Sequence, residues 1–213
     1  KHHKAFAAFA VIMLCTLTSQ ASIWRVNNNP NYTQGCNHCF SSLQAANDTS
    51  IVMAGDTIHL EASANVYLGS ATVNETTLNK RLVILGPGYF LNQNLNLQKN
   101  AIAATVRKLN FSTNSDYSIV KGVSFDWGSN IYGVEIHNAS HILIESCYFG
   151  NGFRFFNSNP ISDITIKKCY ISGAIGSTKA QNITNILFSN CYIGFNVDLY
   201  QAGYSRTGEI SHC

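Results

Sequence analysis

Three segments that align without gaps decide the fold: His141-Ile-Leu-Ile-Glu-Ser-Cys147-Tyr-Phe-Gly150, Asp163-Ile-Thr-Ile-Lys-Lys-Cys169-Tyr-Ile-Ser172 and Asn185-Ile-Leu-Phe-Ser-Asn-Cys191-Tyr-Ile-Gly194. Their cysteines recur every 22 residues, and Cys213 continues the same period. A fixed period of this size is typical of proteins built from stacked structural repeats.

Apolar residues alternate within each copy, as at Ile142, Ile144, Cys147 and Phe149, with one extra residue that we interpret as a corner. Alternation predicts strands rather than helices. A leucine-rich repeat has a similar length but needs a frame of leucines, which this chain lacks. We therefore predict an all-β fold, a right-handed parallel β-helix with about 22 residues per coil and successive coils stacked roughly 4.8 Å apart.

The period loosens upstream of these copies. Residues 120–125 match 144–149 at a spacing of 24, and residues 81–88 indicate an earlier strand that ends in a Gly-Pro turn. Residues 40–53 have modest helical patterning, and residues 54–60 indicate a turn into the first strand. We expect residues 22–60 to form the N-terminal cap and first strand, and 61–213 to form coils that are truncated at the C-terminal end.

The N-terminus predicts export. A basic start at Lys1 and Lys4 precedes a 13-residue apolar run and small residues that favour cleavage after Ala21. Residues 1–21 are therefore interpreted as a signal peptide, too short to be a transmembrane segment, and we expect a secreted or cell-surface protein. Its removal leaves a net charge of about +1, which argues against nucleic acid as a partner.

The chain resembles a known group of proteins in several motifs: Trp24-Arg-Val-Asn-Asn-Asn-Pro30, Leu43-Gln-Ala-Ala46, Gly55-Asp-Thr-Ile58, residues 82–90 and the Ile-x-Ile-x-x-Cys-Tyr-Ile coils. They resemble secreted right-handed parallel β-helix proteins of Bacteroidetes, in the pectate-lyase-like superfamily. The resemblance covers essentially the whole chain and implies the fold. It says little about activity, because that superfamily includes lyases, hydrolases, epimerases and adhesins.

Catalytic residues are hard to nominate. The resemblance implies that lyases of this fold group acidic residues around calcium and use Arg or Lys as the base. Here Asp126, Glu135, Glu145, Asp163 and Asp198 are scattered over different coil positions, and Arg154 has no acidic neighbour in the sequence. Glu145 and Lys167 share a coil position, which favours a surface salt bridge over an acid and base pair.

Hydrolases of this fold, as the resemblance implies, carry Asp-Asp, Gly-His-Gly and Arg-x-Lys motifs, none of which occurs here. No pair of carboxyl groups is apparent for inverting hydrolysis. The sequence therefore nominates no catalytic residue and no cofactor.

The cysteines are interpreted as structural. Cys36-Asn37-His38-Cys39 is the only CxxC, and it lacks a second pair of ligands for zinc, so we favour a disulfide or a pair of thiols bracing the cap. Cys147, Cys169, Cys191 and Cys213 are expected to form an inward-facing core ladder rather than a metal site.

Tyr148, Tyr170 and Tyr192 each follow a ladder cysteine and are expected to point outward. Such rings either stack on one another and shield a corner, or offer a platform for sugar rings. Of these two interpretations we favour mutual stacking. The leading hypothesis is a secreted or cell-surface β-helix that is non-catalytic in this segment, with the aromatic face as its candidate surface for binding polysaccharide. The alternative is a polysaccharide lyase or glycoside hydrolase whose catalytic coils are incomplete in this segment.

Overall fold

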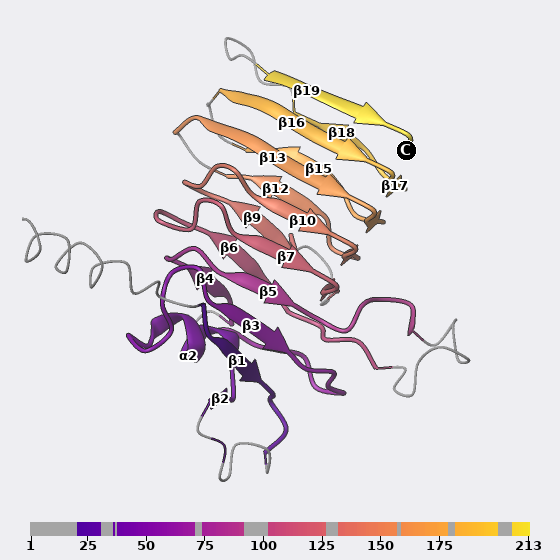
Figure 1. The fold of residues 1–213 in the computed structure, drawn as a ribbon. Coiled ribbons are helices and arrows are strands. Elements are labelled where there is room, and N and C mark those ends of the chain that lie inside the picture. Colours follow the sequence, from indigo (N-terminus) through magenta and orange to yellow (C-terminus); the bar gives the residue numbers. More distant parts are fainter. Residues whose placement is uncertain are drawn as a thin grey trace, which may run out of the picture.

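The computed structural model describes residues 21–30, 36, 38–70, 74–91, 102–126, 132–156, 159–178, 182–199 and 206–213. Its strands form a right-handed parallel β-helix of about 6 turns with about 22 residues per turn, as the sequence predicts (Figure 1). Every pairing between the strands is parallel, and three sheets run along the solenoid. The expected signal peptide lies outside the described residues, apart from Ala21.

The largest sheet has nine strands in the order β19-β16-β13-β10-β7-β5-β3-β1-β2. Its members are β1 (Ile23–Val26), β2 (Cys39–Phe40), β3 (Thr57–Leu60), β5 (Val83–Leu85), β7 (Ile119–Lys121), β10 (Leu143–Glu145), β13 (Ile161–Lys167), β16 (Ile183–Ser189) and β19 (Arg206–Ser211).

The two smaller sheets complete each coil. The four-stranded sheet holds β8 (Ser124–Phe125), β11 (Tyr148–Phe149), β14 (Tyr170–Ile171) and β17 (Tyr192–Ile193). The six-stranded sheet holds β4 (Thr76–Leu78), β6 (Leu109–Phe111), β9 (Val134–Ile136), β12 (Phe153–Phe155), β15 (Ile175–Ser177) and β18 (Val197–Asp198).

The corner between the nine-stranded and four-stranded sheets lies at the residue before each ladder cysteine. Ser146, Lys168, Asn190 and His212 all adopt positive φ there, between 51° and 55°. This left-handed conformation reverses the local path of the chain, so the alternation of side chains is interrupted by one residue. The extra residue in the repeat is therefore the corner that the sequence predicts.

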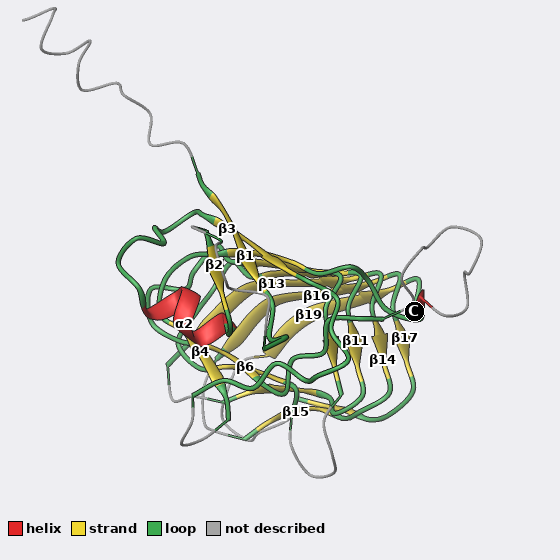
Figure 2. Ribbon diagram, turned by 90° about the horizontal axis from the view of Figure 1, so that it is seen from below, coloured by secondary structure: helices red, strands yellow, loops and turns green. Residues whose placement is uncertain are grey.

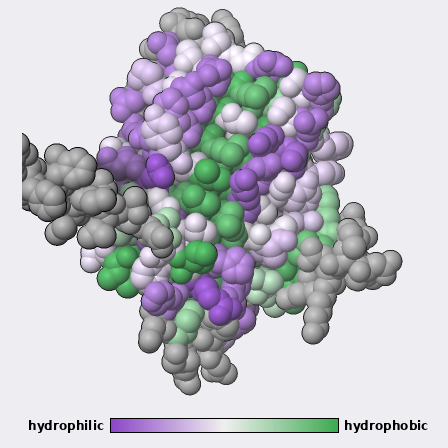
Figure 3. All heavy atoms as spheres, viewed as in Figure 1, coloured by the Kyte–Doolittle hydropathy of each residue, from purple (hydrophilic) through white to green (hydrophobic). Residues whose placement is uncertain are grey.

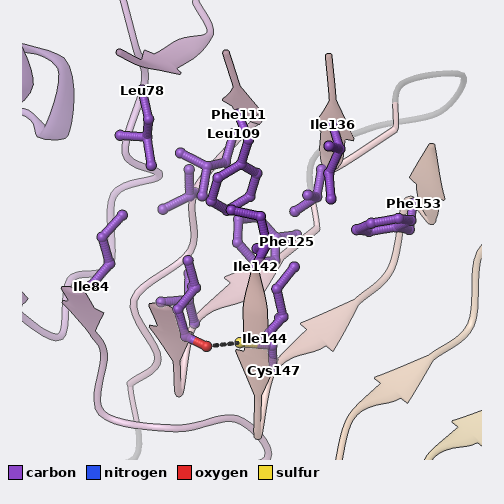
Figure 4. Close-up of a cluster of buried hydrophobic side chains, with 14 of the residues drawn as sticks. Leu78, Ile84, Leu109, Phe111, Phe125, Ile136, Ile142, Ile144, Cys147 and Phe153 are labelled. Atoms are coloured by element: carbon purple, nitrogen blue, oxygen red, sulfur yellow. Dashed lines mark hydrogen bonds between the residues drawn. The ribbon is translucent and has the colours of Figure 1, made fainter. Parts of the chain in front are cut away.

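Inward-facing side chains fill the coil. Ile144, Cys147, Phe149 and Phe153 have no exposed surface, and they pack with the same positions of adjacent coils (Figure 4). On the outside of the nine-stranded sheet, Val83, Ile119, Leu143, Thr165 and Leu187 share one register position. Figure 3 accordingly shows an apolar band bordered by hydrophilic residues on this face.

The N-terminal end differs from the prediction in two ways. The helix α2 covers only Leu43–Asp48, because Ser42 caps its start and Lys80 Nζ donates to Thr49 O and Val52 O just beyond its end. It packs on β1–β4 at the end of the solenoid (Figure 2). The strand after the Gly55 turn is not the first one, because β1 precedes it and pairs with it.

Candidate functional site

The outer face of the four-stranded sheet carries a strip of stacked aromatic rings. Tyr148 lies opposite Tyr170, and Tyr170 lies opposite Tyr192, in the register of adjacent coils. Ring centroids are 5.7 Å apart for Tyr148 and Tyr170, and 4.4 Å apart for the stacked rings of Tyr170 and Tyr192. The three predicted tyrosines therefore form one continuous ladder.

Two further rings join this ladder from the segment after β5. The Phe90 ring lies 5.2 Å from that of Tyr148 and 5.1 Å from that of Tyr170, and the Tyr89 ring stacks on Tyr148 at 6.4 Å. Tyr89 Oη also donates to Lys168 O at 3.2 Å. We call Tyr89, Phe90, Tyr148, Tyr170 and Tyr192 the aromatic strip.

Exposure along the aromatic strip is uneven. Tyr148 and Tyr170 are half-buried because Tyr89 and Phe90 cover part of their surface, whereas Tyr192 is 55% exposed. Burial and the neighbouring Tyr192 raise the pKa of Tyr170 above its ordinary value of 10.0, which already lies far above neutral pH. The open end of the strip is thus a neutral, stacked aromatic surface.

Next to the aromatic strip, Glu145 is surrounded by lysines. Lys167 Nζ, the predicted partner, lies 3.7 Å from its carboxylate, and Lys121 and Lys168 lie closer, at 3.0 and 3.1 Å. Hydrogen bonds from Lys121 and Lys168 lower the pKa of Glu145 to about 2. A carboxylate held this firmly in the ionised state is poorly suited to donate a proton near neutral pH.

The outer face of the six-stranded sheet carries a buried network of charges that the sequence interpretation missed. Glu135 is 2% exposed and accepts a hydrogen bond from Arg154 Nη2, and Lys108 Nζ and His137 Nε2 lie 3.1 and 3.0 Å from its carboxylate. Lys108 Nζ also lies 2.8 Å from Glu75 Oε1. Burial raises the pKa of Glu75, but hydrogen bonds from Lys108 and Asn110 outweigh it and bring that pKa below its ordinary value.

This network corrects two statements made from sequence. Arg154 has an acidic neighbour after all, because β12 pairs with β9 and places Arg154 opposite Glu135. The acids are also not all scattered, because Glu135 and Asp198 lie in one register column through Arg154 and Gly176. The 19-residue separation of Glu135 and Arg154 differs from the 22-residue period, so the repeat does not reveal their alignment.

The cysteine column lies inside the coil. Cys147, Cys169 and Cys191 are buried free thiols, and Cys213 is a free thiol exposed on the last described coil. The Sγ atoms contact carbonyl oxygens of the nine-stranded sheet, as between Cys147 and Val120 at 3.8 Å (Figure 4). A hydrogen bond with the Cys147 thiol and burial raise the pKa of Cys169, so its thiolate is disfavoured.

Cys36 and Cys39 form a disulfide beside β2. The neighbouring ring of His38 stacks on that of Trp24 with centroids 4.8 Å apart, so this short loop packs on the N-terminal strand. Among the described residues no three His, Cys, Asp or Glu side chains are placed to hold a metal ion. In the same residues, no helix has the length and apolar character to cross a membrane.

Comparison with known proteins adds no family to this geometry. No family model, curated protein or solved structure matches the chain. What is shown is a parallel β-solenoid, and candidate functions rest on its own surfaces.

Proposed function

We propose that this chain is a secreted or cell-surface β-helix of pectate-lyase-like type that binds polysaccharide on the aromatic strip without cleaving it. The observation that carries the proposal is Tyr192, whose half-exposed ring forms the open end of a stack that continues through Tyr170. The CH face of a pyranose ring is apolar and packs on such a ring, while its hydroxyls stay in water.

The rigidity of the strip supports binding. Each tyrosine is held by parallel strand pairing, and Phe90 packs against both Tyr148 and Tyr170. Rings that are fixed before the ligand arrives lose little conformational entropy on binding. The lysines around Glu145 add polar donors at the border of the strip.

The proposal is tested with Tyr192→Ala, using Tyr117→Ala as the matched control. Tyr117 is similarly exposed, at 58%, but lies outside the strip, stacked on His141. We expect affinity electrophoresis through gels containing plant and microbial polysaccharides to show retardation that Tyr192→Ala weakens by about tenfold or more. Equal retardation of both variants, or none for the wild-type protein, would refute the proposal.

A polysaccharide lyase or hydrolase is the second candidate, favoured by the gathering of Glu75, Lys108, Glu135 and Arg154 on the six-stranded sheet. Against it, the Glu135 carboxylate is buried and surrounded by cations, which is typical of a structural network. Release of reducing ends or unsaturated products from uronate or neutral polymers, lost in Glu135→Gln and Arg154→Lys, would support the enzyme. Intact polymers after prolonged incubation would exclude it for those substrates.

A further inference from the structure

A buried carboxylate lies where the chain enters the solenoid. Asp56, directly before β3, is 3% exposed, and its Oδ1 atom accepts a hydrogen bond from Ser22 N at 2.8 Å. Its Oδ2 atom accepts from Trp24 Nε1 at 2.7 Å and from Met53 N at 2.8 Å. Asp56 therefore ties the residue before β1 to the buried indole of Trp24 and to the turn that leads into β3.

The three donors to this carboxylate are uncharged N–H groups. Burial raises the pKa of Asp56, but the hydrogen bonds from these donors outweigh it and bring that pKa below its ordinary value of 3.8. Lys80 adds to the lowering through its charge, while its Nζ atom donates to Thr49 O and Val52 O. A buried charge is usually matched by an opposite charge at hydrogen-bond distance, and Ser22 N is an atom that can supply one.

The cleavage site expected from the sequence lies at this contact. Hydrolysis of the Ala21–Ser22 bond adds the hydroxyl of water to the Ala21 carbonyl carbon, and residues 1–21 leave with a terminal carboxylate. The remaining proton of water and the proton of the new carboxyl group pass to Ser22 N, which becomes an ammonium group. The mature chain then begins at the nitrogen that contacts Asp56.

The fold fixes the position of this nitrogen. Thr57 N donates to Ser22 O at 2.9 Å, and β1 pairs with β3 so that Ile23 lies opposite Thr57 (Figure 1). An ammonium group at Ser22 keeps the hydrogen bond to Asp56, and because Ser22 is half-buried, its other N–H groups reach water. A hydrogen bond between a charged donor and a carboxylate is roughly twice as strong as one between neutral groups.

We infer that removal of residues 1–21 completes the N-terminal end of the solenoid, because the new α-ammonium group of Ser22 forms an ion pair with the buried carboxylate of Asp56. The inference rests on the export that the proposed function includes, and it is independent of the aromatic strip. The precursor has an amide at this position, so the start of its β1–β3 pairing is less stable than in the mature chain. Cleavage is thereby coupled to the stability of the N-terminal end.

The test compares two chains, released from a fusion partner by a protease that leaves no extra residues. One begins at Ser22 and the other at Ser19, which moves the ammonium group by up to about 10 Å but keeps a serine at the N-terminus. Both are also made with Asp56→Asn and with Glu61→Gln. Glu61→Gln is the matched control because Glu61 pairs with Arg25 in the same part of the fold.

Thermal unfolding measures Tm for each chain. We expect the chain that begins at Ser22 to have a Tm roughly 2–4 °C above that of the longer chain. The difference should vanish with Asp56→Asn and persist with Glu61→Gln. Equal Tm values, or a difference that survives in folded Asp56→Asn, would overturn the inference.

Carbamylation by cyanate at pH 8, followed by peptide mass spectrometry, needs no substitution and decides the question if Asp56→Asn does not fold. Cyanate reacts with the unprotonated amine, and pairing with Asp56 favours the protonated form. Ser22 should therefore react about tenfold more slowly than Ser19, and equal rates would overturn the inference.

N-terminal sequencing of the exported protein should give Ser22 as the first residue, and any other first residue would also overturn the inference. Absence of retardation in the polysaccharide gels would instead remove the proposed binding on the aromatic strip and leave the ion pair standing.

Discussion

Replacing Glu135, the buried carboxylate of the six-stranded sheet, should lower the free energy of unfolding more than replacing a surface charge does. Glu135 is 2% exposed and contacts Arg154, Lys108 and His137. In Glu135→Leu, the Arg154 guanidinium stays largely buried between two aromatic rings without its carboxylate, whereas Lys108 keeps Glu75 at 2.8 Å. The loss of stability therefore comes mainly from the Arg154 guanidinium, which is left buried without its carboxylate.

Breaking a buried ion pair on one side costs about 3–5 kcal/mol, and the partial exposure of Arg154 and the remaining partner of Lys108 favour the lower end of that range. A cost of about 3 kcal/mol lowers Tm by roughly 6–12 °C in a chain of this size. The matched control is Glu145→Gln, because the three lysines that pair with Glu145 reach solvent and screening keeps the expected loss at about 1 kcal/mol in spite of the lowered pKa.

Urea unfolding followed by circular dichroism measures these differences. The double variant Glu135→Leu with Arg154→Leu removes both charges together, so it should be more stable than Glu135→Leu alone. If Glu135→Leu lowers stability no more than Glu145→Gln does, or if the second substitution adds its own loss, the network is not a buried ion pair and the reasoning is wrong.

Three further outcomes are expected. The pKa of Glu145 in the folded protein lies at about 2, below its ordinary 4.5, so its contribution to stability is present above pH 4.5 and is lost as the pH falls toward 2. Glu145→Gln should therefore make the urea midpoint depend less on pH between 4.5 and 2. An unchanged dependence of the midpoint on pH would contradict this. Ser146→Asn should raise the free energy of unfolding by up to about 1 kcal/mol, since asparagine tolerates the left-handed corner better, and Asn190→Ser should lower it; the opposite signs in urea titrations would disprove the corner argument. Iodoacetamide should modify Cys213 in the folded protein and Cys191 only in denaturant, because a hydrogen bond with the Cys169 thiol and burial raise the pKa of Cys191. Peptide mass spectrometry measures this directly, and early modification of Cys191 would place it outside the core.

The coil itself was predictable because its signals are local. The alternation around Cys147 and the extra corner residue are both set within a few positions, and an unbroken 22-residue period carries them through three coils. The helix at residues 40–53 was predicted too long, since the capping side chain of Ser42 and the reach of Lys80 to Val52 O decide its ends. Lys80 is distant in sequence, so local patterning does not contain that contact.

The surfaces were only partly predictable. Tyr148, Tyr170 and Tyr192 follow from the period, but Tyr89 and Phe90, which half-cover the first two, come from a segment outside the repeat. The charged network was missed for a related reason. The loops that lead into the six-stranded sheet vary in length, so Glu135 and Arg154 are aligned by strand pairing and not by a constant spacing.

The most direct test of the central claim is hydroxyl-radical footprinting of the protein with and without a saturating oligosaccharide taken from the polymer that binds best. The proposed stacking of sugar on the aromatic strip predicts that oxidation of Tyr192 falls severalfold on binding while that of Tyr117 stays constant. An oligosaccharide that binds and leaves Tyr192 as reactive as before would contradict it.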